Sequence, residues 1–155
     1  MKGDGKVIEH LNHLLAGELT AVDQYFIHSR MYQEWGLSKL HSHVEHEMQE
    51  EQAHASHLVR RILFLEGTPD VGSRAPLHVG QDVTQMLRND LDLEYRVISE
   101  LREVITYCET VQDYETRNIL QGLLKDTEED HTRWLEIQLG LIDKIGLPNY
   151  IQSQM

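Results

Sequence analysis

Apolar residues recur every three or four positions along four long stretches of the chain, and strand-like alternation is nearly absent. This spacing gathers the apolar side chains on one face of a helix. The stretches run from near Asp4 to Glu34, from Ser38 to Glu66, from about Asp82 to Cys108 and from about Asp113 to Lys144. The sequence therefore predicts an all-α protein with four helices, each about 42 to 48 Å long at about 1.5 Å per residue.

Glycine and proline separate these stretches. Gly36 follows the first, and Pro148 opens a short segment after the fourth. The connection from Gly67 to Gly80 is too long for a tight turn, so it can cross from one end of a bundle to the other. The second and third helices would then run in the same direction, whereas the short connections favour antiparallel neighbours. We expect one domain, residues 1–155, with one long crossover loop and a short C-terminal fifth helix.

Polar residues interrupt each apolar stripe near its midpoint. The first and third helices each carry a single inward glutamate, and the second and fourth each carry a Glu-x-x-His pair, which an α-helix places on one face. These residues are Glu18, Glu51, His54, Glu94, Glu128 and His131. One such pair is unremarkable, but two pairs that alternate with two single glutamates indicate a common site in the bundle centre.

Charge indicates what this site binds. Each buried carboxylate without a partner costs several kcal/mol, and two divalent cations would cancel four negative charges. Neutral imidazoles add nitrogen ligands without adding charge, which favours iron, manganese or zinc over calcium and magnesium. The alternative is a set of ordinary buried ion pairs, but no Lys or Arg lies at the middle of the stripes.

Composition narrows the classes of function. The net charge of −12 argues against binding to a phosphate backbone, so we expect no nucleic-acid partner. The chain has no apolar run long enough for a transmembrane span and no signal core at its start, which leads us to expect no membrane contact and a cytoplasmic location. A single cysteine, Cys108, cannot form an internal disulfide and fits a reducing compartment.

With these residues in place, the chain resembles bacterioferritin over nearly its whole length. The segments that carry the resemblance are MKGDGKVIEHLNHLLAGEL, DQYFIHSRMYQEWGLSKL, EEQAH, RRILFLEGTP, DVTQMLRNDLDLE, TEEDHTRWLE and GLPNYIQSQM. The resemblance implies a ferritin-like four-helix bundle with a di-iron centre. It implies that Glu51 and Glu128 bridge two iron ions. The remaining ligands would be Glu18 with His54 for one ion, and Glu94 with His131 for the other.

The resemblance also implies a function. Proteins of this kind are ferroxidases that oxidise Fe2+ to Fe3+ with dioxygen or hydrogen peroxide, and they store and detoxify iron as a mineral inside a cage. The implied cage has 24 subunits built from dimers, with the short helix from Pro148 to Met155 near the fourfold axes. A ferredoxin-type reductant is one partner to consider.

Three further residues match positions of the family. An inner-surface iron site is implied at His46, with Glu50 four residues further on; the alternative is a solvated histidine on the outer face of the helix. Tyr25 lies two turns from Glu18 and matches the tyrosine beside the di-iron centre. Its role would be either auxiliary redox chemistry or packing with a hydrogen-bonded hydroxyl group.

The sequence departs from the family at the haem site. Bacterioferritins bind haem between two subunits through a methionine from each, and Gln52 occupies that position here. A side-chain amide is a poor ligand for haem iron compared with a thioether, so haem b is not expected in a homomeric cage. Met48 falls on the inward stripe, where packing is its expected role. A mixed cage could instead leave haem to a methionine-bearing bacterioferritin subunit.

Three other functions use related helical bundles. A rubrerythrin-like peroxidase would carry an additional four-cysteine iron module, which one cysteine excludes. A DNA-protecting mini-ferritin would place its metal site between subunits, whereas this chain has a complete set of its own. A shell subunit with a mainly structural role stays open, and the rate of iron oxidation separates it from the ferroxidase.

Overall fold

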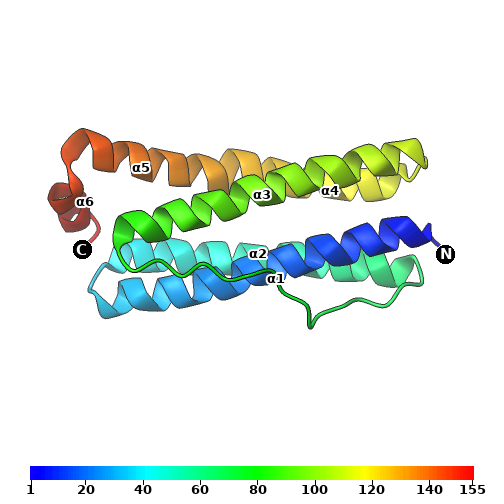
Figure 1. Cartoon of the computed structure of the whole chain (residues 1–155), viewed down its shortest axis with the longest axis horizontal. Helices are drawn as coiled ribbons and strands as arrows, with labels where there is room; N and C mark the ends of the chain where they lie inside the picture. The colour runs from blue at the N-terminus through cyan, green and yellow to red at the C-terminus, as the bar shows by residue number, and fades with distance from the viewer.

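The computed structural model describes residues 1–155, and every regular element in it is helical. Figure 1 shows the long helices packed side by side, with the short terminal helix across one end. The helices are α1 (Gly5–Glu34), α2 (Ser38–Phe64), α3 (Val83–Thr110), α4 (Tyr114–Asp126), the π-helix η1 (Thr127–Thr132), α5 (Arg133–Ile145) and α6 (Leu147–Ser153). The segments α4, η1 and α5 follow one another without a break and form the fourth long helix. The predicted ferritin-like four-helix bundle with a short fifth helix is therefore confirmed.

The helix ends follow the capping chemistry of the sequence. Asp4, Asp82 and Asp113 each cap a helix by accepting hydrogen bonds from backbone N–H groups of its first turn. Helix α2 begins at Ser38 itself, and the residue before it, Leu37, makes no side-chain cap. The second helix also ends before Glu66, which adopts a left-handed φ of 64° and turns the chain away.

The connection between α2 and α3 runs along the bundle past α1, so α2 and α3 point in the same direction, as expected (Figure 1). One face of α1 holds this crossover in place. Side chains spaced four residues apart accept hydrogen bonds from its backbone N–H groups, in the pairs Thr20 with Ala75, Gln24 with His78 and His28 with Gly80. A Cβ atom at Gly80 would lie 2.5 Å from the Met86 backbone nitrogen, so only glycine fits there.

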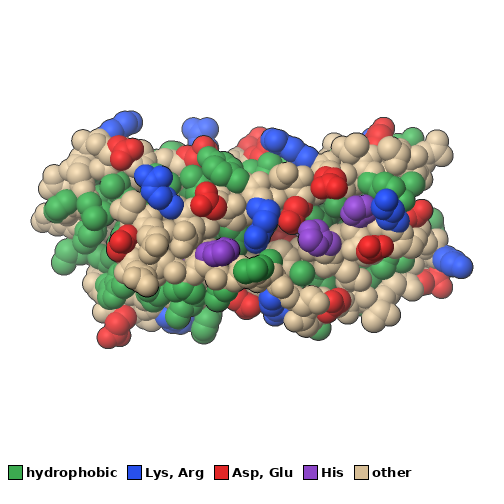
Figure 2. Space-filling view, viewed as in Figure 1, with side chains coloured by type: hydrophobic (Ala, Val, Ile, Leu, Met, Phe, Trp, Pro, Cys, Tyr) green, Lys and Arg blue, Asp and Glu red, His purple; other side chains and the backbone are tan.

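Apolar side chains from all the long helices form one core of 26 buried residues. The same core includes Tyr150 of α6, whose hydroxyl group donates a 2.7 Å hydrogen bond to Gln138, so the terminal helix is attached to the bundle. Figure 2 shows acidic, basic and histidine side chains interspersed on the face it displays, with no continuous basic patch. None of the helices combines the length and hydropathy needed to cross a bilayer.

Candidate metal centre

Five of the six predicted ligands meet inside the bundle, in two groups that share one residue. Ligand atoms of Glu18, Glu51 and His54 lie within 4.8 Å of one another, and so do those of Glu51, Glu94 and His131. All five residues are buried, with at most 4% of their surface exposed. The structure therefore brings together five of the residues that interrupt the apolar stripes.

Glu51 lies between the two histidines. Its Oε2 atom is 3.6 Å from His54 Nδ1, and its Oε1 atom is 2.7 Å from His131 Nδ1. At the same ring nitrogens, Glu18 lies 3.6 Å from His54 Nδ1 and Glu94 lies 3.5 Å from His131 Nδ1. The imidazole rings are nearly parallel, with centroids 5.7 Å apart. The result is a row of two triads that meet at Glu51, each with two carboxylates at one imidazole nitrogen.

Several polar atoms in this row have no hydrogen-bond partner although they are fully buried. They are Glu18 Oε2, Glu94 Oε2, His54 Nδ1 and His131 Nδ1. Unsatisfied buried polar atoms are rare because each costs about 1 to 3 kcal/mol. Oxygen and imidazole nitrogen atoms that converge in this way are the donor set that divalent iron, manganese or zinc accepts, so the residues present fit a metal centre.

The pKa values show how the negative charge of the buried carboxylates is compensated without metal. Burial and the nearby Glu51 carboxylate raise the pKa of Glu18 well above its ordinary value. Burial alone would lower the pKa of His54, but the neighbouring carboxylates of Glu18 and Glu51 raise it to about 11. The pKa of His131 is likewise raised, against its burial, by Glu47, Glu51 and Glu94. The buried carboxylates therefore favour the protonated form of both imidazoles in the metal-free protein.

A carboxylate also lies behind each histidine. The outer Nε2 atom of His54 is 3.2 Å from Asp126 Oδ2. That of His131 is 2.6 Å from Glu47 Oε2 and 2.7 Å from Glu50 Oε2. Such partners orient an imidazole so that its other nitrogen faces the metal. Two of these carboxylates, Glu47 and Asp126, were not predicted from the sequence. The four-residue spacing from Glu47 to Glu51 could have revealed Glu47. Asp126 reaches His54 from another helix, so no local spacing indicates it.

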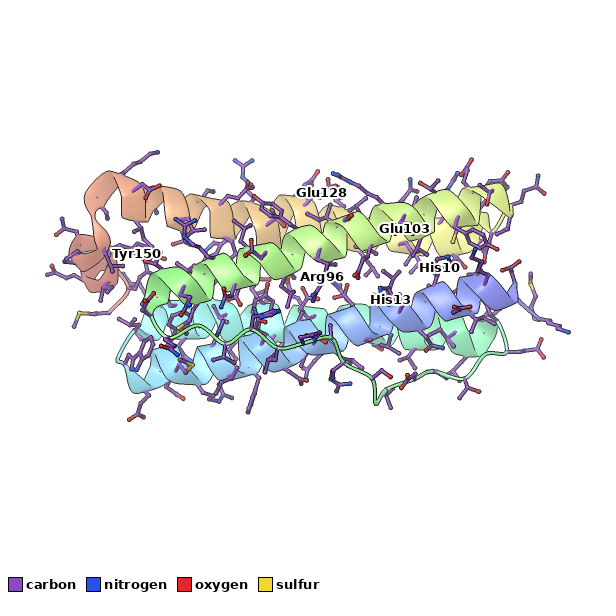
Figure 3. All side chains as sticks on the ribbon, in the orientation of Figure 1. His10, His13, Arg96, Glu103, Glu128 and Tyr150 are labelled. Carbon is purple, nitrogen blue, oxygen red and sulfur yellow. The ribbon has the colours of Figure 1, made fainter.

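Glu128 is the predicted ligand that the structure does not bring to the other five. Its side chain is 36% exposed and accepts a 2.8 Å hydrogen bond from Arg102 Nη2. Figure 3 labels it on the fourth long helix. The reason is local: η1 is a π-helix, whose wider turns no longer place residues three apart on one face. The inward position is taken by Thr127, which is fully buried and bonds its hydroxyl group to the Leu123 carbonyl oxygen.

The remaining predicted residues lie around the centre. Tyr25 is buried and donates a hydrogen bond to Glu94, and burial with the nearby Glu94 and Asp90 charges raises its pKa. His46 Nε2 lies 2.9 Å from Glu50 Oε1, and the His46 side chain is 62% exposed. Together Glu47, Glu50 and His131 form a third group of ligand atoms. The expected inner-surface pair is therefore adjacent to the centre through Glu50.

The haem position lies apart from these groups. Gln52 is exposed on α2, one residue beyond the buried Glu51. Met48 is partly buried and packs against the core, as its place on the apolar stripe predicts.

A four-helix bundle with one crossover, whose centre gathers glutamates and histidines from every long helix, belongs to the class of carboxylate-rich metal-binding bundles. Residues 8–145 match the family model described as a ferritin-like domain. A protein named bacterial ferritin from Synechocystis sp. is 61% identical, covering all of this chain and 99% of the relative. One from Paramagnetospirillum magnetotacticum is 57% identical over 99% of this chain and 94% of its own length. A protein named bacterioferritin from Rhodobacter capsulatus is 42% identical over 94% of this chain and 90% of its own length.

The chain therefore belongs to the ferritin family. The resemblance to bacterioferritin that the sequence motifs indicated is confirmed by these relatives.

Proposed function

We propose that this protein stores and detoxifies iron, and that it oxidises Fe2+ at a di-iron site inside each subunit. The observation that carries the proposal is the buried row of Glu18, Glu51, His54, Glu94 and His131, whose ligand atoms converge. Four of these residues each leave one buried ligand atom without a hydrogen-bond partner. The family relationship supports iron as the metal.

Iron is the substrate of the proposed reaction. Two Fe2+ ions lose one electron each, and the pair of electrons with two protons converts dioxygen to hydrogen peroxide, or hydrogen peroxide to two water molecules. The carboxylates of Glu18, Glu51 and Glu94 supply negative charge that stabilises the rise in positive charge. The Nδ1 atoms of His54 and His131 can bind a metal only after losing a proton, so iron binding releases protons. Tyr25 fixes the Glu94 carboxylate through its hydrogen bond and has an auxiliary role.

Glu128 is the sixth ligand in this proposal. To reach the other five residues its carboxylate has to leave Arg102, and both side chains are exposed enough to move. The position of Glu128 favours a second candidate function, in which the chain is a shell subunit with a mainly structural role in a mixed bacterioferritin cage. The two candidates differ in the rate of iron oxidation.

Stopped-flow mixing of the metal-free protein with Fe2+ and dioxygen tests the proposal. Replacing Glu51 by Gln removes the charge shared by both groups, and we expect the fast phase of iron oxidation to fall at least tenfold. Glu103→Gln, which changes an exposed carboxylate on α3, is the matched control and should oxidise iron at the original rate. Oxidation by Glu51→Gln as fast as by this control would favour the shell subunit.

We also propose that the subunits form a hollow cage, as ferritin family members do, with 24 copies built from dimers and α6 near the fourfold axes. The attachment of α6 supports this, because the buried Tyr150 and a 3.0 Å bond from the Lys39 N–H to the Gln154 carbonyl oxygen fix its position. Light scattering should give the mass of 24 subunits of 18.1 kDa.

A further inference from the structure

The two Glu-x-x-His pairs lie on helices of different geometry. On α2, a continuous α-helix, Glu51 and His54 both face the centre. On η1 only His131 does, because the π-helical turn directs Glu128 to the surface and Thr127 inward. Three of the four predicted ligand glutamates therefore face the centre, and Glu128 does not.

The number of ligand carboxylates makes the two iron positions unequal. Glu47 and Glu50 contact the outer nitrogen of His131, and Asp126 contacts that of His54, so these carboxylates lie behind the rings. The carboxylates that face the metal positions are those of Glu18, Glu51 and Glu94. Their three charges match one divalent ion fully and a second only in part. Glu128 is the predicted ligand that could supply the fourth carboxylate.

Arg102 holds Glu128 away from the centre. It extends from α3, and its guanidinium group contacts no carboxylate other than that of Glu128. Arg102 is 63% exposed and Glu128 is 36% exposed, so the pair is a surface ion pair of modest strength. Binding of a second ion can break this ion pair, but the free energy needed to break it lowers the affinity for that ion.

We propose that Arg102 is a positioning residue that keeps Glu128 outside the centre, so that the second metal ion binds more weakly than the first and draws Glu128 inward by breaking the ion pair. This inference rests on the proposed iron-binding function and concerns the order in which the two positions fill.

Calorimetry of the metal-free protein with Co2+ tests the inference without any oxidation step. The original protein should bind two ions with unequal dissociation constants. Arg102→Gln should tighten the second constant about two- to fivefold, the range expected for loss of an exposed ion pair. Arg102→Lys keeps the charge and should restore the original value. Arg96→Gln, which neutralises another arginine of α3 with no carboxylate partner, is the matched control and should leave both constants unchanged.

The combination of Arg102→Gln with Glu128→Gln completes the test. Glu128→Gln alone should weaken the second ion, and adding Arg102→Gln to it should have no further effect, because the two residues act through one contact. Two equal constants in the original protein, or an Arg102→Gln effect that matches Arg96→Gln or persists in the double variant, would overturn the inference. Those outcomes leave the metal centre intact, whereas a protein that binds no Co2+ would overturn the proposed function as well.

Discussion

The stability of the metal-free protein should fall as the pH rises above neutrality. The folded centre holds protons that the unfolded chain releases, because the pKa of His54 is raised to about 11 and that of His131 is also raised, from an ordinary value of about 6.5. Stabilisation by a group with a raised pKa is complete below its unfolded value and is lost as the pH rises toward the folded value. Glu18, whose pKa is raised mainly by burial, acts in the same direction.

The size of the effect follows from the number of protons held. Each proton bound only in the folded state costs about 1.4 kcal/mol of stability per pH unit. Loss of the protons on two imidazoles then lowers the free energy of unfolding by about 4 kcal/mol between pH 7 and 8.5. This value is an upper limit because the two groups are coupled. For a chain of this size, a change of 1 kcal/mol shifts the Tm by about 2 to 4 °C. The metal-free Tm should therefore fall by several degrees over this interval.

Thermal unfolding of chelator-treated protein between pH 6.5 and 9 measures this slope. Growing surface charge also lowers stability at high pH, so the decisive comparison is between variants. His54→Gln should flatten the slope by about one proton, whereas His57→Gln, which replaces an exposed histidine of the same helix, should not. Saturating Co2+ should raise the Tm and reverse the slope, because metal binding releases protons and strengthens with pH. A metal-free Tm that stays constant or rises over this range, or equal slopes in the two variants, would refute the reasoning.

Two further predictions concern single residues. The homomeric protein should show no Soret band, because the Gln52 amide replaces the thioether ligand, and Gln52→Met should introduce one when haem is supplied; a band of about one haem per dimer in the original protein would contradict this. Asp126→Asn should weaken Co2+ binding about tenfold by freeing the His54 ring to rotate, with Asp130→Asn as the control; equal affinities of the two variants would show that the contact does not orient the ring.

The sequence predicted most of the fold because its signals were local. Apolar spacing gave the four long helices, and the aspartates at Asp4, Asp82 and Asp113 mark the positions where α1, α3 and α4 begin. The predicted end of α2 at Glu66 lies beyond the observed end at Phe64, because Glu66 rather than a glycine adopts the left-handed conformation. Hydrogen bonds from α1 to the crossover could not be predicted, because they depend on how segments distant in sequence pack together.

The predicted residues come together where a regular α-helix carries them, and one of them does not where the helix is irregular. Glu51 and His54 obey the three-residue spacing of the α-helix. The same spacing from Glu128 to His131 predicted that both of these side chains face the centre. The pattern Glu-x-x-His, however, contains no information on whether the helical turn is α or π. Asp126 was missed for a related reason, since its contact with His54 joins two helices.

The same acids and histidines make the centre compatible with two states of the bundle. Without metal, the protons on His54 and His131 balance the neighbouring carboxylates, and the 26-residue apolar core surrounds them on every helix. The fold therefore does not depend on iron, in contrast to small metal-stabilised domains that unfold without their ion. In the proposed metal-bound state, cations would take the place of these protons at the Nδ1 atoms and carboxylate oxygens. Because the apolar core does not involve the ligands, the affinity of the centre for iron would then depend on competition with protons.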